Sequence, residues 1–284
     1  MKTILIVIAG MADTPDPLSR RDTPLVTALT PSLDTLARRG EMLAFPSLDD
    51  SFDYSHKNAL LSILGYDLQR GEPSIHELME YGLTNNVDIT GFKSLRPFVL
   101  PGFSGHGICA TTSAWVRGVA KCAMIKPVDI YSPGSSDEDI LDTVAHIAIS
   151  AVPANEFVLI YADSPLKASL KGDFENKISA LETIDRVLIN PIADFVWKSE
   201  LMINLAITTD LVTPWHTRQP VGIDVPAILY FNNHDAEGDP ELNFSEVTAL
   251  LMRRDFRHPS DLMRYLVNFS VAEEDEDSSE NYPF

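Results

Sequence analysis

The sequence predicts an α/β fold in which helices flank a mostly parallel β-sheet. Two short, mostly apolar runs have the length and composition of strands that are buried on both faces: Phe157–Ala162, which is uninterrupted, and Ile203–Ile207, which contains one polar residue, Asn204. After the first run, apolar side chains recur at helical spacing from Phe174 to Leu188. A buried strand followed by an amphipathic helix is typical of parallel α/β sheets. The chemistry of such sheets lies on the segment after a strand's carboxyl end, here a predicted loop over 163–171.

The N-terminal segment predicts the first central strand, at Thr3–Ala9, and then a helix. The apolar core of this segment is short and a single lysine precedes it, which favours a buried strand over a signal peptide. Further on, Thr30 has the side chain of an N-cap, Pro31 suits the first helical position, and Gly40 is expected to end the helix.

The segment 69–154 is predicted to be an insertion, because glycine, proline and short strands dominate its first part. Within it, apolar spacing predicts a helix over Asp137–Ala148. The last segment, 271–284, is rich in acidic residues and lacks an apolar period, so we expect a disordered acidic tail.

The formal net charge of −19 argues against two classes of partner. A field of this sign repels phosphate backbones and anionic lipids, so neither nucleic acid nor a membrane surface is an expected partner. No apolar run reaches the roughly 20 residues that span a bilayer, and we expect a cytoplasmic protein. The two cysteines, Cys109 and Cys122, are too few for a disulfide framework and predict buried apolar residues.

Three segments resemble the archaeal-type cofactor-independent phosphoglycerate mutases of the alkaline phosphatase superfamily. They are TPSLDTLA at 30–37, LSILGYD at 61–67 and GDFENKISALETIDRVL at 172–188. The resemblance covers most of the chain in unbroken order. It implies an alkaline-phosphatase-like core formed by 1–68 and 155–270, and it makes 69–154 a shortened cap domain.

The resembled enzymes bind two divalent ions, manganese or zinc, through seven positions that include the nucleophilic serine. In this chain only Asp210 keeps the expected side chain. The other six positions hold Ala9, His56, Leu166, Leu170, Leu211 and Pro220. One carboxylate is too few to fix two ions, and the leucines place hydrocarbon where hydrated cations would lie. We therefore expect no metal cofactor and a former active site that is filled by apolar packing.

Two residues remain candidates for catalysis, and a rebuilt metal site is a further alternative. The nucleophile position holds His56, and a slipped loop would present Ser55, which needs a base or a metal to become a nucleophile. A structural role is the favoured interpretation of Ser55. A single zinc or manganese ion could instead bind to loop residues that the fold gathers at the sheet edge: Asp13, Asp53, His56, Asp163, Asp210 and His216.

Four basic residues are candidates for holding an anionic ligand. These residues could be remnants of a site that binds a phosphosugar acid: Arg70, Arg96, Arg117 and Lys121. The alternative is that they are solvated surface charges. Two functions are therefore open. The first is a catalytically inactive homologue that binds a small anionic ligand or a protein partner and serves as a binding or regulatory protein. The alternative is a phosphomutase- or phosphatase-type enzyme with a relocated active site.

Overall fold

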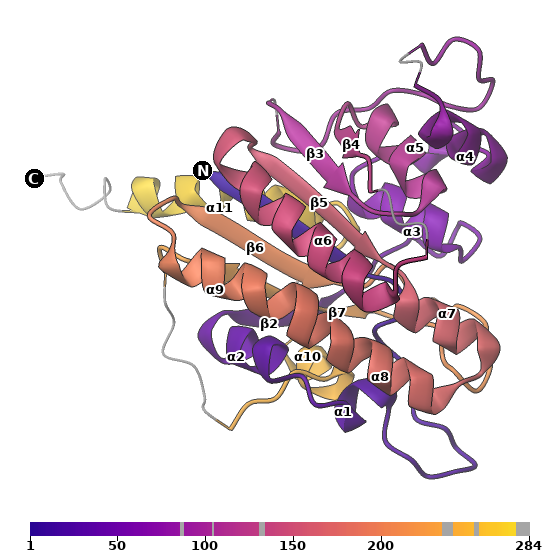
Figure 1. Cartoon of the computed structure of the whole chain (residues 1–284), viewed down its shortest axis with the longest axis vertical. Helices are drawn as coiled ribbons and strands as arrows, with labels where there is room; N and C mark the ends of the chain where they lie inside the picture. The colour runs from indigo at the N-terminus through magenta and orange to yellow at the C-terminus, as the bar shows by residue number, and fades with distance from the viewer. Residues whose placement is uncertain (86–87, 104, 131–133, 235–240, 253–255, 277–284) are drawn as a thin grey trace, which may run out of the picture.

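The computed structural model describes the chain except for residues 86–87, 104, 131–133, 235–240, 253–255 and 277–284. Its centre is a seven-stranded sheet (Figure 1). From one edge to the other, the strands are β2 (Glu41–Phe45), β7 (Val225–Phe231), β6 (Ile203–Thr208), β1 (Lys2–Ile8), β5 (Phe157–Ala162), β3 (Gly107–Ala110) and β4 (Lys126–Val128).

Most of this sheet is parallel, as predicted. Strands β4, β3, β5, β1 and β6 pair in parallel, whereas β7 runs antiparallel to both β6 and β2. Strand β1 therefore lies at the centre, and β5 and β6 end beside it at the same edge. The strands predicted at the N-terminus, at Phe157–Ala162 and after Ile203 are confirmed.

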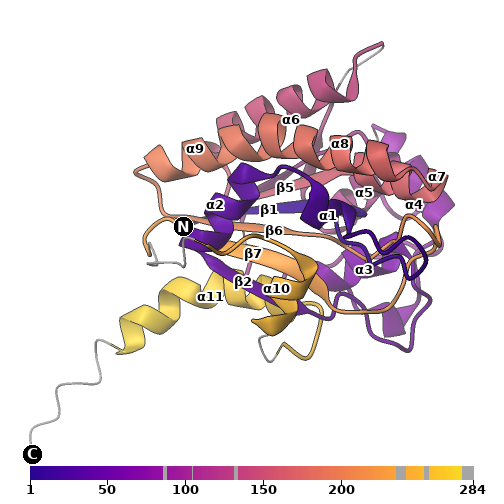
Figure 2. The same cartoon turned by 90° about the horizontal axis from the view of Figure 1, so that it is seen from below.

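Alternate side chains of β1 enter two separate cores, because successive residues of a strand point to opposite faces. Ile4, Ile6 and Ile8 pack on one face, and Leu5 and Val7 pack on the other. Figure 2 shows helices on both sides of the sheet. Helices that contribute to the first core are α1 (Pro24–Thr27), α2 (Pro31–Arg39), α6 (Asp137–Ala151), α8 (Phe174–Ile184), α9 (Asn190–Lys198) and α10 (Glu246–Leu251).

The second core receives side chains from the helices α3 (His56–Ile63), α4 (Ile75–Leu83), α5 (Ala114–Cys122) and α11 (Asp261–Glu276). This packing does not match the predicted boundaries of the cap. Strands β3 and β4, which lie within 69–154, are part of the main sheet, and Leu78 of α4 shares a core with Leu5 of β1. A domain has its own core, so in the described residues this segment is continuous with the sheet.

Two further boundaries differ from the prediction. The expected loop over 163–171 is mostly a helix, α7 (Ser164–Lys171), because Pro165 suits its first turn and Gly172 ends it with φ 73°. Gly172 is therefore the end of α7, and Asp173 caps α8 by accepting from Asn176 N at 3.1 Å. At the C-terminus, α11 continues to Glu276, so only 277–284 of the expected tail lies outside the described residues.

Helix α2 begins at Pro31 as predicted, but a distant residue caps it. The Thr30 side chain makes no capping hydrogen bond. Instead, the Asp185 carboxylate accepts from Leu33 N at 2.8 Å and from Ser32 N at 3.1 Å. Burial raises the pKa of this carboxyl group, and the two backbone donors oppose that shift. Asp185 belongs to a single π-turn, Asp185–Ile189, that joins α8 to α9.

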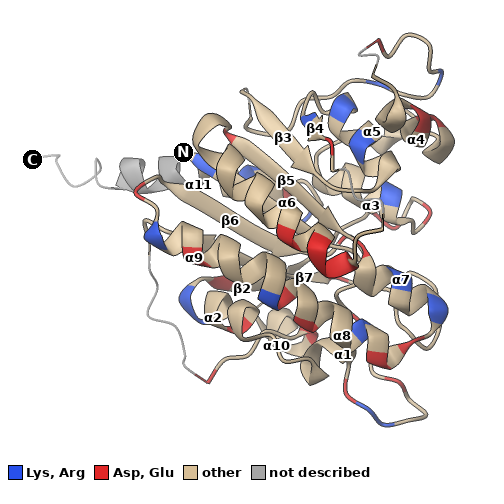
Figure 3. Ribbon diagram, in the orientation of Figure 1, with Lys and Arg blue, Asp and Glu red and all other residues tan. Residues whose placement is uncertain are grey.

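Charged side chains are concentrated on helices and loops, and β5 and β6 carry none (Figure 3). In the part of the chain that the structure covers, no helix combines the length and the apolar composition that a bilayer span requires. Cys109 and Cys122 are both buried as free thiols, in agreement with the prediction. Burial raises the pKa of each thiol to about 12.

Candidate functional site

The candidate site lies where β1, β5 and β6 end side by side. Asp210 follows β6 and is fully buried, Tyr161 belongs to β5, and His56 is the first residue of α3. His56 Nδ1 lies 2.8 Å from Asp210 Oδ1, a distance typical of an ion pair, but the imidazole ring is not aligned for a hydrogen bond to this oxygen. The position that holds the nucleophile in the resembled enzymes therefore carries an imidazole directed at the remaining carboxylate.

Both oxygens of Asp210 are engaged within the protein. Oδ2 accepts from the Tyr161 hydroxyl at 2.9 Å, and Oδ1 accepts from Leu211 N at 2.8 Å while it contacts His56. Burial and the Asp210 charge raise the pKa of the Tyr161 phenol far above its ordinary value, so Tyr161 remains a donor. Burial disfavours the charged form of His56, but the Asp210 carboxylate outweighs this effect and raises the pKa of His56.

The imidazole of His56 also has a partner on its other nitrogen. Nε2 lies 3.1 Å from Thr213 Oγ1, which produces a Thr213–His56–Asp210 chain. A hydroxyl, an imidazole and a carboxylate in this order form the arrangement that activates an oxygen nucleophile. Thr213 is, however, completely buried. In this conformation the hydroxyl is a structural hydrogen-bond partner, because a substrate cannot reach it.

A second buried ion pair adjoins this chain. Lys177 Nζ lies 2.7 Å from Asp13 Oδ2, and both side chains are 0% exposed. The ammonium group also donates to Ala12 O at 3.3 Å and to Thr213 O at 3.2 Å. Burial lowers the pKa of Lys177, and the Asp13 carboxylate opposes that shift. The edge of the sheet thus already contains a fixed positive charge that is surrounded by three oxygen atoms.

Buried Glu246 extends this polar network toward α10. One carboxylate oxygen accepts from Asp13 N at 2.9 Å and the other accepts from the Thr23 hydroxyl at 2.9 Å. Burial raises the pKa of Glu246. Asp13 Oδ2 also accepts from Trp215 N at 3.1 Å. Hydrogen bonds and ion pairs therefore connect the loops after β1 and β6 to α8 and α10.

Apolar residues occupy other positions that hold metal ligands in the resembled enzymes, with one departure from the expectation. Ala9 and Leu211 are fully buried, and Leu166 packs against the core from partly exposed surroundings. Leu170, in contrast, is 52% exposed on α7, so the expectation that apolar packing fills the site is wrong for this residue. Leu166 lies in the first turn of α7, against the turn at Gly10, whereas Leu170 lies one turn further along the helix, at its end.

Helix α7 lies directly on the turn that follows β1. Gly10 has φ +72°, and a Cβ atom there would lie 2.6 Å from Leu166 Cα. Only glycine permits this approach, since a side chain would collide with backbone. The segment that carries metal ligands in the resembled enzymes is thus a helix packed onto the first strand's turn.

This set of side chains does not match the donors that two divalent ions require. Among the described residues, no group of three or more His, Cys, Asp or Glu side chains is placed to hold an ion. Asp210 is the carboxylate kept at a ligand position of the resembled enzymes, and its oxygens already have three protein partners. A metal ion there would have to displace these partners and would face the buried Lys177 ammonium group.

The structure gathers only part of the predicted rebuilt site. His56 and Asp210 lie in contact, but Asp13 pairs with Lys177, and Asp163 pairs with Lys167 at 2.8 Å. The ring of His216 packs edge-on against Trp215, and the exposed Asp53 contributes its backbone carbonyl to Asn58 Nδ2. The other catalytic candidate, Ser55, accepts from Asn58 N at 3.2 Å and caps α3.

The four basic candidates lie in two different pockets. Arg117 and Lys121 line a cavity of about 570 Å³ beside β4, whereas Arg70 and Arg96 line a separate cavity of about 490 Å³. Arg117 donates to Val128 O at 2.9 Å and pairs with Asp129, and Lys121 donates to Tyr81 O at 2.6 Å. Arg70 pairs with Asp67 at 3.1 Å. The sequence did not predict this division.

Four residues of the buried polar contacts described above were not predicted from the sequence: Tyr161, Lys177, Thr213 and Glu246. A signal existed for Lys177, which lies three residues after Phe174 and four before Leu181, on the apolar face of its helix. A charged residue on such a face is seldom buried without a partner. No comparable pattern marks Tyr161, which reads as an ordinary residue of a buried strand.

Comparison with known proteins shows which proteins this chain is similar to. No family model matches the chain. A 2,3-bisphosphoglycerate-independent phosphoglycerate mutase of Pyrobaculum arsenaticum is 29% identical over 139 residues, which are 48% of this chain and 31% of that enzyme. A second enzyme of this name, from Saccharolobus islandicus, is 30% identical over 171 residues, 54% of this chain and 40% of that one. The chain is a relative of the cofactor-independent phosphoglycerate mutases. It spans about a third of the length of the first curated relatives it matches.

Solved structures with the same fold cover nearly the whole chain. The PH0037 protein of Pyrococcus horikoshii has a TM-score of 0.74 and 18% identity, and the alignment covers 100% of this chain and 98% of that one. The cofactor-independent phosphoglycerate mutase of Thermoplasma acidophilum has a TM-score of 0.63 and 14% identity, with 94% and 99% coverage. These likenesses confirm the predicted fold class, an α/β fold in which helices flank a mostly parallel sheet.

The His56–Asp210 contact predicts a specific pH dependence of stability. The folded-state pKa of His56 lies above its ordinary value of 6.5, so the pair stabilises the fold below that pH and the contribution disappears as the pH rises through the folded-state pKa. We expect the difference in free energy of unfolding between the wild-type chain and His56→Gln to shrink from about pH 5 to about pH 8. Urea unfolding across that range measures it.

Replacement of the exposed His146 of α6 by glutamine is the matched control. That variant is expected to retain the wild-type slope of stability against pH. A His56→Gln variant with the same slope as wild type would contradict the assigned ion pair.

Proposed function

We propose that this chain is a non-catalytic relative of the cofactor-independent phosphoglycerate mutases that acts in the cytoplasm as a binding or regulatory protein. In this proposal it binds no pair of manganese or zinc ions and does not interconvert phosphoglycerates. Its ligand or partner is a small anionic compound or another protein. The kinship to the mutases supports the fold, and the side chains at the former site support the loss of chemistry.

One observation carries the proposal. Asp210, the carboxylate that remains from the resembled ligand set, is enclosed by His56, Tyr161 and the backbone of Leu211. A two-metal site needs several carboxylate and imidazole groups whose lone pairs face the ions. Here the lone pairs face protein donors, and the cavity beside Arg117 and Lys121 remains as a place where an anion could bind.

The test measures metal content and mutase activity on the same preparation. We expect less than one equivalent of manganese or zinc after purification without chelators, and no conversion of 3-phosphoglycerate to 2-phosphoglycerate with added manganese. The Saccharolobus islandicus relative, purified and assayed identically, is the positive control. Two equivalents of metal or measurable conversion would overturn the proposal.

The Thr213–His56–Asp210 chain favours a second candidate, a hydrolase or phosphotransfer enzyme with a relocated nucleophile. This function requires a movement that exposes Thr213, which is buried in the structure. Hydrolysis of p-nitrophenyl phosphate and of p-nitrophenyl acetate tests it. Activity that is lost in both Thr213→Val and His56→Gln would establish this candidate, whereas activity retained in Thr213→Val would exclude the assigned nucleophile.

A further inference from the structure

A cavity of about 490 Å³ lies at the end of α3 that is remote from His56. We call it the Arg70–Arg96 pocket. Two segments line it, one that follows α3 and one that follows residue 95: Gly65, Tyr66, Asp67, Arg70, Arg96, Pro97, Phe98 and Val99. The eight residues of α3 extend for about 12 Å, so the pocket is distinct from the His56–Asp210 contact. Its volume falls within the range that is common for small-molecule sites.

Backbone and ring contacts hold the two segments together. Tyr66 N donates to Leu61 O at 2.8 Å, and the Tyr66 hydroxyl donates to Gly71 O at 3.2 Å. Phe98 N donates to Cys122 O at 2.9 Å, which fixes the second segment to the end of α5. The rings of Tyr66 and Phe98 meet edge-on, with their centroids 5.3 Å apart. The aromatic floor of the pocket is therefore formed before any ligand binds.

The lining of the pocket carries a net positive charge. Its charged residues are Arg70, Arg96 and Asp67, and every lining residue belongs to the described part of the chain. Two positive charges and one negative charge leave a net charge of +1. At contact distance these groups act on a ligand more strongly than the distant, screened charges that make up the chain's −19. The pocket therefore favours a single negative charge.

The guanidinium groups have hydrogen-bond donors to spare. Arg96 Nη1 donates to Lys93 O at 2.9 Å and to Leu95 O at 3.0 Å, and within the described residues Nε and Nη2 have no protein acceptor. Arg70 uses Nε to reach Asp67 Oδ2 at 3.1 Å, which leaves both of its terminal nitrogens. The Arg70 side chain is 81% exposed, and Arg96 is also exposed. A ligand can therefore reach both groups without displacing a protein contact.

Both arginines act on the same part of the floor. Burial raises the pKa of the Tyr66 phenol, and the charges of Arg96 and Arg70 oppose that shift. Beside them lie apolar side chains that solvent also reaches: Val99 is 60% exposed, and Pro97 is exposed. Guanidinium groups match a carboxylate in two-point hydrogen bonds, and exposed apolar surface gains free energy when a hydrocarbon covers it.

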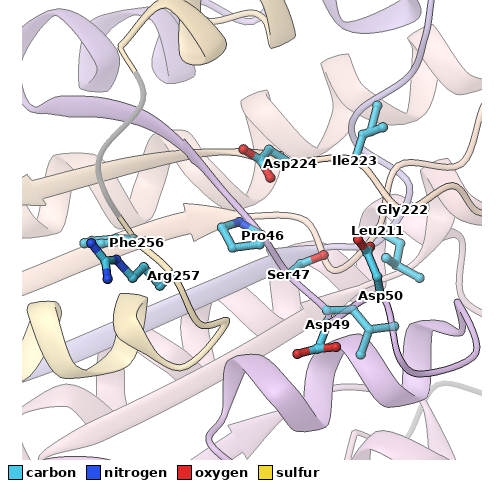
Figure 4. Close-up of a pocket in the computed structure, with 11 residues that line it drawn as sticks. Pro46, Ser47, Asp49, Asp50, Leu211, Gly222, Ile223, Asp224, Phe256 and Arg257 are labelled. Atoms are coloured by element: carbon cyan, nitrogen blue, oxygen red, sulfur yellow. The ribbon is translucent and has the colours of Figure 1, made fainter.

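A second cavity offers a less suitable place for an anion. Figure 4 shows this cavity, of about 510 Å³, beside Leu211. The side chains of Asp49 and Asp50 are part of its lining and would oppose a carboxylate there. The Arg70–Arg96 pocket has one carboxylate, Asp67, and both of its oxygens are engaged, by Gln69 N at 3.1 Å and by Arg70 Nε.

We propose that the Arg70–Arg96 pocket binds a small aromatic monocarboxylate. The carboxylate accepts from the terminal nitrogens of Arg70 and from Nε and Nη2 of Arg96, and the ring covers Val99 and Phe98. One negative charge neutralises the lining, and a hydrocarbon ring suits the apolar surface better than a hydroxylated phosphate ester does. This inference rests on the part of the proposed function that gives the chain a small anionic ligand. It is independent of the loss of metal-dependent chemistry.

Isothermal titration of the full chain with 3-phenylpropionate tests the proposal. We expect saturable binding that weakens as salt rises, because screening reduces charge attraction. Arg96→Gln removes free donors and a charge and should raise the Kd by about tenfold or more. Val99→Asp places a negative charge at an exposed position of the apolar wall and should also raise the Kd. Because Val99 supports no core contact, this variant keeps the test valid if Arg96→Gln fails to fold.

Matched ligands separate the contributions of charge and ring. Acetate has the charge without the ring and should bind at least about tenfold more weakly, since the ring's apolar burial is lost. The neutral 3-phenylpropan-1-ol should show no saturable binding. Equal binding of this alcohol, tighter binding of inorganic phosphate or 3-phosphoglycerate, or no binding of 3-phenylpropionate would overturn the proposal.

Two control variants locate the ligand. Lys126→Gln removes a charge from the cavity beside Arg117, and Arg186→Gln removes one from a distant exposed ion pair. Both should leave the Kd unchanged. A loss in either control equal to that of Arg96→Gln would contradict the assigned pocket. Metal content and mutase activity, measured separately, report on the proposed loss of catalysis alone.

Discussion

Replacement of Lys177 by methionine is expected to lower the free energy of unfolding by about 3–5 kcal/mol. The ammonium group lies 2.7 Å from Asp13 Oδ2, and neither side chain is exposed to solvent. Methionine fills a similar volume but leaves the Asp13 carboxylate buried without its counter-charge. Desolvation of that uncompensated charge, rather than lost packing, is the cause of the expected effect. Urea unfolding monitored by circular dichroism measures it.

The double variant Lys177→Met with Asp13→Asn distinguishes charge from packing. Asparagine keeps an oxygen acceptor for Trp215 N, so the double variant should be more stable than the sum of the two single effects implies. Lys167→Met is the matched control, because Lys167 pairs with Asp163 at the surface of α7. Exposed pairs contribute about 0–1 kcal/mol. Similar losses for Lys177→Met and Lys167→Met would contradict the buried-pair assignment.

Leu211→Ala is expected to cost about 2–5 kcal/mol, the range found for buried leucines. Leu211 is fully buried and belongs to the core on the α3 side of the sheet. The equivalent change at Leu170 should stay within about ±0.5 kcal/mol, because 52% of that residue is exposed. Thermal or urea unfolding of the two single variants gives the comparison.

The contrast between these two leucines tests how the former metal positions are used. Leu166 is partly buried against the core, and Leu166→Ala should fall between the other two variants. A Leu170→Ala loss as large as that of Leu211→Ala would show that α7 packs differently from the structure. Negligible losses of unfolding free energy at all three positions would indicate that apolar packing by these leucines does not stabilise this edge of the sheet.

The sequence alone predicted the central architecture. Strand β5 and helix α8 were predictable because burial on both faces gives a continuous apolar run and one buried helical face gives a 3.6-residue period. The resemblance to the mutases, by contrast, places Ala9 and Leu166 at positions that hold metal ligands in those enzymes, and neither side chain can coordinate a metal. The sequence also predicted the helix that starts at Pro31.

Only the tertiary structure decided how distant polar groups pair. Asp185 caps α2 from 152 residues away, and His56 meets Asp210 across the edge of the sheet. Neither pairing has a local signature, because each depends on which loops the sheet order brings together. For the same reason the strands within 69–154 could not be assigned to the main sheet in advance: a short strand's own residues do not identify its neighbour, and hydrogen bonding to β5 supplies that information.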